Sequence, residues 1–99
     1  MAGPIYSLFM FKPTQAWYQL SKEEQDKLMA KVGEALDRVG GKSVLMCNSA
    51  WSNEQWLGFG VEEYPDIEAV QKSKQILLEL DWYRYVEGVS LLGSKWESS

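Results

Sequence analysis

The sequence predicts an α+β domain with the element order β-α-β-β-α-β, and three observations lead to that prediction. An aromatic and apolar run opens the chain between two prolines, two stretches carry apolar residues at helical spacing, and residues 43–62 between them alternate as two strands around a polar turn. A further apolar strand follows the second helical stretch. With 99 residues the chain has room for one hydrophobic core, so we expect a single domain over residues 1–99.

The first predicted strand is the segment 5–12, IYSLFMFK, which lies between Pro4 and Pro13. Both of its alternate sets of side chains are mostly apolar, which is typical of a central strand that is covered on two sides. Ser7 is the exception in this strand. It is either a hydrogen-bonded hydroxyl in a tight place or a polar point on the floor of a pocket.

Both predicted helices carry capping signals. Ser21 and Glu24 form an S-x-x-E capping box, so the first long helix should begin there and end at Gly40-Gly41. Residues 13–20 before it form a connector or a first helical turn. Asp66 is the expected N-cap of the second helix, which residues 81–84 close.

The two middle strands are expected at residues 42–51 and 55–62, joined by a polar turn. In the later strand the apolar set Leu57, Phe59 and Val61 should face the helices. The other set contains Trp56, Gly58, Gly60 and Glu62. Two glycines on one face of a strand leave a floor that another backbone or a ligand can approach closely.

With a last strand at residues 85–92, this order is that of a ferredoxin-like fold, a four-stranded antiparallel sheet with two helices on one face. The opposite sheet face would then be open. The residues expected on it are Trp56, Gly58 and Gly60, with part of the set Asn48, Trp51, Tyr85 and Glu87. So aromatic a face should be covered, either by a second subunit or by a nucleic acid.

Composition excludes several functions. The net charge of −4 opposes binding to nucleic acid or to an anionic membrane. The chain contains no His and a single Cys, which removes imidazole bases, zinc sites and disulfides, so we expect no metal. No basic segment precedes an apolar run at the N-terminus and no apolar run approaches the ~20 residues of a membrane span, so a cytoplasmic protein is expected.

Two resemblances bear on function. The segment 57–64, LGFGVEEY, resembles in part the third-strand octamer of RNA-recognition motifs, although Leu57 stands at its basic position. The segments 16–24, AWYQLSKEE, and 82–87, WYRYVE, resemble those of the darcynin-like proteins. That resemblance covers nearly the whole chain and implies membership of the dimeric α+β barrel superfamily, in which two ferredoxin-like subunits press their open sheet faces together.

The superfamily resemblance implies a homodimer with a ligand pocket between sheet and helices, and a range of activities. Its members include cofactor-free monooxygenases, polyketide cyclases, lactone isomerases and haem enzymes that degrade haem, dyes or chlorite. The lack of His departs from the haem members and from the His-based cyclase mechanism. The cofactor-free monooxygenases use Asn, Trp and Tyr side chains, all of which this chain contains.

Glu87, Asn48 and Tyr85 are the predicted catalytic residues. A partly buried Glu87 would be a general acid or base; otherwise it pairs with Arg84 or with a lysine of a second subunit. The Asn48 amide would stabilise an enolate or phenolate, or else serve the turn. The predicted substrate-binding residues are Ser7, Trp51, Trp56, Gly58 and Gly60.

The sequence thus leaves three hypotheses open. The first is a homodimeric enzyme that acts, without metal or cofactor, on a small apolar or aromatic metabolite through an enol or phenol, as a monooxygenase, isomerase or cyclase. The second is a ligand-binding or stress-response barrel that has the same pocket and no turnover. The third is an RNA-binding domain, which requires an exposed sheet.

Overall fold

The computed structural model describes residues 3–97 and contains four strands and four helices in that range. Met1 and Ala2, on which the prediction about a leader partly depends, lie outside the described residues. The elements are β1 (Ile5–Pro13), α1 (Gln15–Tyr18), α2 (Lys22–Arg38), β2 (Lys42–Asn48), β3 (Gly58–Tyr64), α3 (Ile67–Glu79), α4 (Trp82–Tyr85) and β4 (Val86–Ser94). Over this range, none of the helices is both long and apolar enough to cross a bilayer.

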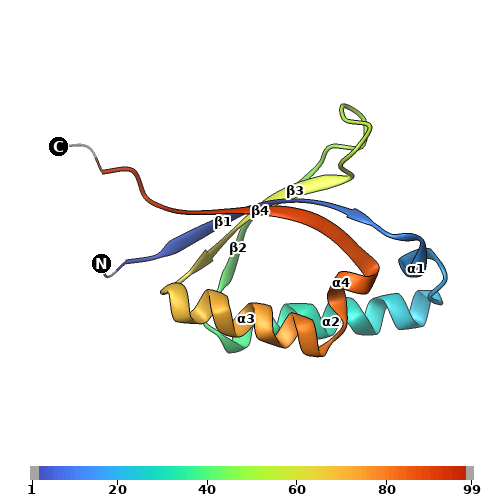
Figure 1. Ribbon diagram of the computed structural model, residues 1–99, viewed down its shortest axis with the longest axis horizontal. Helices are drawn as coiled ribbons and strands as arrows, with labels where there is room; N and C mark the ends of the chain where they lie inside the picture. Colours follow the sequence, from blue (N-terminus) through green and yellow to red (C-terminus); the bar gives the residue numbers. More distant parts are fainter. Residues whose placement is uncertain (1–2, 98–99) are drawn as a thin grey trace.

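The four strands form one sheet in the order β2-β3-β1-β4, and every neighbouring pair is antiparallel. The predicted ferredoxin-like fold is therefore confirmed, with β1 as a central strand between β3 and β4. Both long helices, α2 and α3, lie on the same side of the sheet (Figure 1). Within residues 3–97, no helix covers the other face of the sheet.

The predicted helix starts are correct, because local hydrogen bonds determine them. The Ser21 Oγ accepts a hydrogen bond from the Glu24 N–H at 3.1 Å, and the Glu24 carboxylate accepts one from the Ser21 N–H at 2.8 Å. The Asp66 carboxylate accepts a hydrogen bond from the Ala69 N–H at 2.8 Å. Each cap satisfies backbone donors that have no partner within their helix.

Two short helices, α1 and α4, join the long helices to the sheet at one end of the molecule (Figure 1). Thr14 ties them together, because its N–H donates to the Tyr85 carbonyl at 2.9 Å and its hydroxyl donates to the Arg84 carbonyl at 2.7 Å. The Trp17 and Trp82 rings also meet edge to face, with centroids 6.5 Å apart. This end of the fold is thereby closed by α1 and α4.

The prediction for the two faces of β3 is wrong. Gly60 and Gly58 lie beside Phe9 and Phe11 of β1, on the face toward the helices, so Phe59 and Val61 lie on the open face. A Cβ at Gly60 would come within 2.8 Å of the Phe9 ring, and one at Gly58 within 2.8 Å of the Phe11 ring. The glycines do not leave an empty floor, since the aromatic rings of the neighbouring strand occupy the space.

The middle strands are also shorter than predicted, because a hydrogen-bonded loop separates β2 from β3. The Ser49 hydroxyl donates to the Trp56 carbonyl at 2.9 Å, and the Asn53 side-chain oxygen accepts from the N–H groups of Gln55 and Trp56 at 2.8 Å each. Trp51 and Trp56 therefore belong to the loop and not to a strand. Tyr85 likewise ends α4 and does not begin β4.

The open sheet face is mainly aliphatic rather than rich in tryptophan, which corrects the residues predicted for it. Its exposed apolar side chains are Leu8, Met10, Leu45, Val89 and Leu91. Leu91 is the most exposed of them at 68%. A large apolar surface is still present, but other residues form it.

The buried core is small and lies where β3 leads into α3. Tyr64, Ala69 and Val70 form it, and Leu36 and Val39 from the end of α2 pack against it. Only two residues separate β3 from α3, and only three separate α2 from β2. These short connections hold the helices close to the sheet at this end.

Candidate functional site

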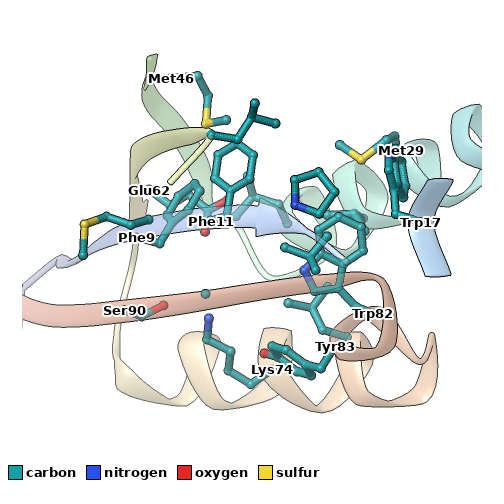
Figure 2. A pocket seen from close by; sticks show the side chains of 18 of the residues that line it. Phe9, Phe11, Trp17, Met29, Met46, Glu62, Lys74, Trp82, Tyr83 and Ser90 are labelled. Atoms are coloured by element: carbon teal, nitrogen blue, oxygen red, sulfur yellow. The ribbon is translucent and has the colours of Figure 1, made fainter. Parts of the chain in front are cut away.

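A cavity of about 570 Å³ lies between the sheet and the helices, beyond the buried core (Figure 2). Every helix and at least one residue of each strand contribute to its wall. Most of the wall is apolar or aromatic: Phe9, Phe11, Trp17, Met29, Val32, Leu36, Met46, Leu77, Trp82 and Val86. A volume of this size, with few polar groups, is typical of a site for a small apolar molecule.

The sequence builds this cavity through its placement of large and small residues. The Phe9 and Phe11 rings form the floor, above the two glycines of β3. Trp17 and Trp82 form an end wall through their edge-to-face contact. On the helix side, Gly33 of α2 lines the cavity, and no neighbouring atom of the described residues lies within 4 Å of where its Cβ would be.

The polar residues of the cavity wall include Glu62, Lys74, Tyr83 and Ser90. Glu62 comes from β3, on the same face as the glycines, and is half-buried. Its Oε1 atom accepts a hydrogen bond from the Tyr64 hydroxyl at 2.7 Å. The carboxylate is therefore fixed in position at the cavity wall.

Burial and nearby negative charge keep two phenols neutral around Glu62. Burial raises the pKa of Tyr64 far above its usual value; the Glu62 carboxylate raises it further, and the Ser73 hydroxyl partly opposes the shift. The pKa of Tyr83 is raised by burial first and by the Glu62 charge second. Both phenols thus remain hydrogen-bond donors at neutral pH.

Ser7 lies beside Glu62 in the register of β1 and β3. Its side chain is 1% exposed, and its hydroxyl has no hydrogen-bond partner among the described residues. A buried hydroxyl without a partner is uncommon and requires an explanation, such as a water molecule or a ligand group. Of the predicted substrate-binding residues, Ser7 is the one nearest in register to the carboxylate.

The predicted catalytic residues do not come together at the cavity. Glu87 is on the open face of β4 and forms an exposed ion pair with Lys12 at 3.6 Å. The Asn48 side-chain oxygen accepts a hydrogen bond from the Ala50 N–H at 2.9 Å, as expected for a turn residue. Tyr85 is half-buried at the end of α4, beneath the Arg84 guanidinium at 6.0 Å.

The predicted substrate-binding residues divide into two groups. Gly58 and Gly60 underlie the Phe11 and Phe9 rings of the cavity floor. Trp51 is 85% exposed in the loop before β3. Trp56 is half-buried in the same loop, with the Lys12 ammonium 5.7 Å from its ring centroid.

Sequence reasoning missed Lys74, Tyr83 and the position of Glu62. Glu62 shares an alternate set with the two glycines, and the sequence predicts that set on the face away from the helices. Lys74 had a usable signal, since it falls at helical spacing between Val70 and Leu77, in the stripe that faces the sheet. A charged residue in such a stripe indicates a polar point inside the fold.

The side chains present do not suit a haem group bound through imidazole or thiolate. The chain has no His, and Cys47 pairs in register with Phe59, on the open face. Among the described residues, His, Cys, Asp and Glu form no group of three or more able to hold a metal ion. The chemistry available in the cavity is that of a carboxylate, an ammonium and hydroxyl groups.

The fold and the cavity define a ferredoxin-like α+β domain with a pocket between its sheet and its helices. The chain belongs to a protein family of unknown function, DUF6616, whose model matches residues 6–98. This match does not test the resemblance to darcynin-like proteins, which remains a prediction. A search of curated proteins gives no significant match.

Solved structures share the fold. A mutant chlorite dismutase from Candidatus Nitrospira defluvii superposes with a TM-score of 0.76 at 11% identity, over 99% of this chain and 42% of that protein. A protein of unknown function from Rhodopseudomonas palustris gives a TM-score of 0.66 at 18% identity, over 99% of this chain and 86% of that one. The chain thus spans less than half of the chlorite dismutase, and at these identities the likeness shows the fold alone.

Proposed function

We propose that the protein binds a small, largely apolar or aromatic molecule in the cavity between its sheet and its helices. The observation that carries this proposal is the cavity volume of about 570 Å³, lined mainly by apolar side chains with a carboxylate held at the wall. Aromatic walls with few fixed polar groups are common in sites for small ligands. The similarity to a chlorite dismutase supports the fold and carries no substrate over to this chain.

Binding is tested with the neutral fluorescent probe N-phenyl-1-naphthylamine, followed by energy transfer from tryptophan. We expect one probe molecule per chain. Replacing Gly33→Trp should weaken binding at least tenfold, because the indole enters the space that Gly33 leaves open. The matched control is Ala30→Trp, at an exposed position of α2 that does not line the cavity. Equal binding by both variants would place the probe elsewhere and overturn the proposal.

We further propose that the protein is a cofactor-independent enzyme of the monooxygenase, isomerase or cyclase type. In this mechanism Glu62 removes a proton from an activated C–H or O–H bond of the ligand, and the bonding electrons form an enolate or phenolate. Tyr83 donates a hydrogen bond to the developing negative charge, since its phenol stays protonated. The anion then rearranges, closes a ring or reacts with dioxygen.

Enolisation is the step that these three reactions share, so it is the step to measure. Deuterium exchange of 2-indanone in D2O, followed by NMR, reports proton removal without knowledge of the natural substrate. We expect wild-type protein to accelerate exchange and Glu62→Gln to remove roughly 10²-fold or more of that acceleration. Glu87→Gln is the control, because Glu87 lies on the opposite face.

If probe binding is intact but exchange is not accelerated, the second hypothesis, a ligand-binding protein without turnover, replaces the first. If Glu87→Gln and not Glu62→Gln abolishes exchange, Glu87 is the base, as the sequence predicts.

We also propose that the open sheet face is covered by a second copy of the chain. The exposed aliphatic side chains on this face, among them Leu8, Val89 and Leu91, support the proposal, as does the predicted superfamily. Native mass spectrometry should give a dimer for wild-type protein. Leu91→Asp should shift it to monomer, whereas Leu78→Asp on α3, also exposed, should leave the dimer intact. A monomeric wild-type protein would refute this proposal.

A further inference from the structure

We infer that the ligand of this cavity carries an anionic group of the carboxylate class, and that Lys74 binds it together with the hydroxyl groups of Ser90 and Tyr83. The inference rests on the proposed binding function and specifies the ligand. It does not depend on turnover.

The first argument is the position of the ammonium group. Lys74 is half-buried and lines the cavity. Figure 2 shows its side chain rising from α3 toward β4, with the nitrogen directed at the strand that carries Ser90. A lysine that only solubilised the helix would direct its nitrogen into water, as side chains of this length do at a surface.

The second argument concerns charge. Across residues 3–97 the ion pairs join Lys12 to Glu87, Lys22 to Asp26, Lys27 to Glu23 and Arg84 to Asp81. Lys74 is in none of them. Glu62 lines the same cavity but is hydrogen-bonded to Tyr64, and among the described residues it forms no ion pair with Lys74. An ammonium in an apolar cavity gains most from an anion that arrives with the ligand.

The third argument is that neutral donors accompany the ammonium. Tyr83 and Ser90 line the cavity, on α4 and β4 respectively. In Figure 2 the Tyr83 ring lies beside the Lys74 side chain. An ammonium with two hydroxyl donors suits the two oxygens of a carboxylate, which accept several hydrogen bonds. The apolar part of the ligand would then lie against the Phe9 and Phe11 floor.

The test compares 2-naphthoate with 2-naphthamide, which have nearly the same shape and differ in charge. Isothermal titration calorimetry measures the affinity of each compound for the full chain. We expect wild-type protein to bind the naphthoate at least tenfold more tightly, and Lys74→Met to bring the two affinities together. Lys74→Arg should restore most of the preference, because it retains the charge.

The control is Lys72→Met, an exposed position on the same helix that does not line the cavity, which should preserve the preference. If the neutral probe and both naphthalene compounds bind equally well, with no effect of Lys74→Met, this inference is refuted and the proposed binding function stands. If neither wild-type protein nor the Gly33→Trp variant binds the neutral probe or either naphthalene compound, this inference and the proposed binding function are both refuted. Circular dichroism of Lys74→Met establishes that it is folded.

Discussion

The space between sheet and helices is packed at one end and hollow at the other, although the hollow end is lined by the larger apolar side chains. At the packed end Tyr64, Ala69 and Val70 are at most 8% exposed. At the hollow end, larger side chains such as Phe9, Trp17 and Trp82 surround a cavity of about 570 Å³. Side-chain size alone therefore does not decide which end is filled.

The connections between the elements explain the difference. At the packed end, short segments join β3 to α3 and α2 to β2, so the long helices must lie close to the sheet. At the hollow end, α1 stands between β1 and α2, and α4 stands between α3 and β4. Because Thr14 ties α4 to the end of β1, these short helices hold the wall in place without filling the space.

The comparison of the packed and hollow ends predicts its largest effect, on the free energy of unfolding, when one valine at each end is truncated to alanine. Val70→Ala at the packed end should lower the free energy of unfolding by roughly 2–3 kcal/mol, since it removes buried carbon atoms and leaves a void. Val32→Ala at the hollow end should cost less than about 1 kcal/mol, because its side chain already borders empty space. Urea unfolding followed by tryptophan fluorescence measures both values. Equal losses would contradict the division into two ends.

The next effect concerns the floor of the hollow end. A Cβ at Gly60 would lie 2.5 Å from the Met46 sulfur and 2.8 Å from the Leu45 carbonyl oxygen. Gly60→Ala should therefore destabilise the fold by about 1–3 kcal/mol, because the neighbouring strand must shift. Gly93→Ala in β4 is the control, since no atom of residues 3–97 that could clash lies within 4 Å of that Cβ position. If Gly60→Ala leaves the stability unchanged, the cavity floor is packed less tightly than the contacts around Gly60 indicate.

The features that the sequence predicts correctly depend on neighbouring residues, and the features that it predicts wrongly depend on residues far away in the chain. The capping box at Ser21 and the N-cap at Asp66 depend on residues three positions away, so their sequence signals were sufficient. The strand order follows from the order of the elements. The face of β3 was assigned wrongly because both alternate sets were compatible with burial, and the Phe9 and Phe11 rings that decide between them come from another strand.

The candidate site was harder to predict than the helix starts, because residues from other elements determine which side chains line it. Glu87 was chosen as a carboxylate in an apolar strand, but its neighbour across the sheet is Lys12, which places it on the open face. Glu62 acquires its setting from Tyr64, Tyr83 and Ser7, which belong to β3, α4 and β1. Such a setting exists only once the fold brings these elements together.

A smaller effect should appear at alkaline pH. The pKa of Tyr64 is raised in the folded protein above the value near 10 of the unfolded chain. Above about pH 10 the unfolded chain loses this proton and the folded protein keeps it, so stability should fall as the pH rises. Thermal unfolding between pH 8 and 11 measures the slope, and Tyr64→Phe should make it shallower.

Tyr83→Phe provides the comparison with the hollow end. The pKa of Tyr83 is raised as well, but this side chain is 47% exposed whereas Tyr64 is 2% exposed. We therefore expect Tyr83→Phe to change the alkaline slope less than Tyr64→Phe does. The opposite order would indicate that the hollow end excludes water better than the packed end.

The smallest effect is expected for Ser7→Ala. The Ser7 hydroxyl is buried and has no hydrogen-bond partner in the described part of the chain, so Ser7→Ala deletes an unsatisfied group. The substitution should change the free energy of unfolding by less than about 0.5 kcal/mol, or raise it slightly. Ser73 is the matched control, because it is also buried and its hydroxyl acts on the Tyr64 phenol, whose pKa it lowers. Ser73→Ala should cost about 1 kcal/mol. A clear loss of stability for Ser7→Ala would mean that its hydroxyl has a hydrogen-bond partner in solution, such as a buried water molecule.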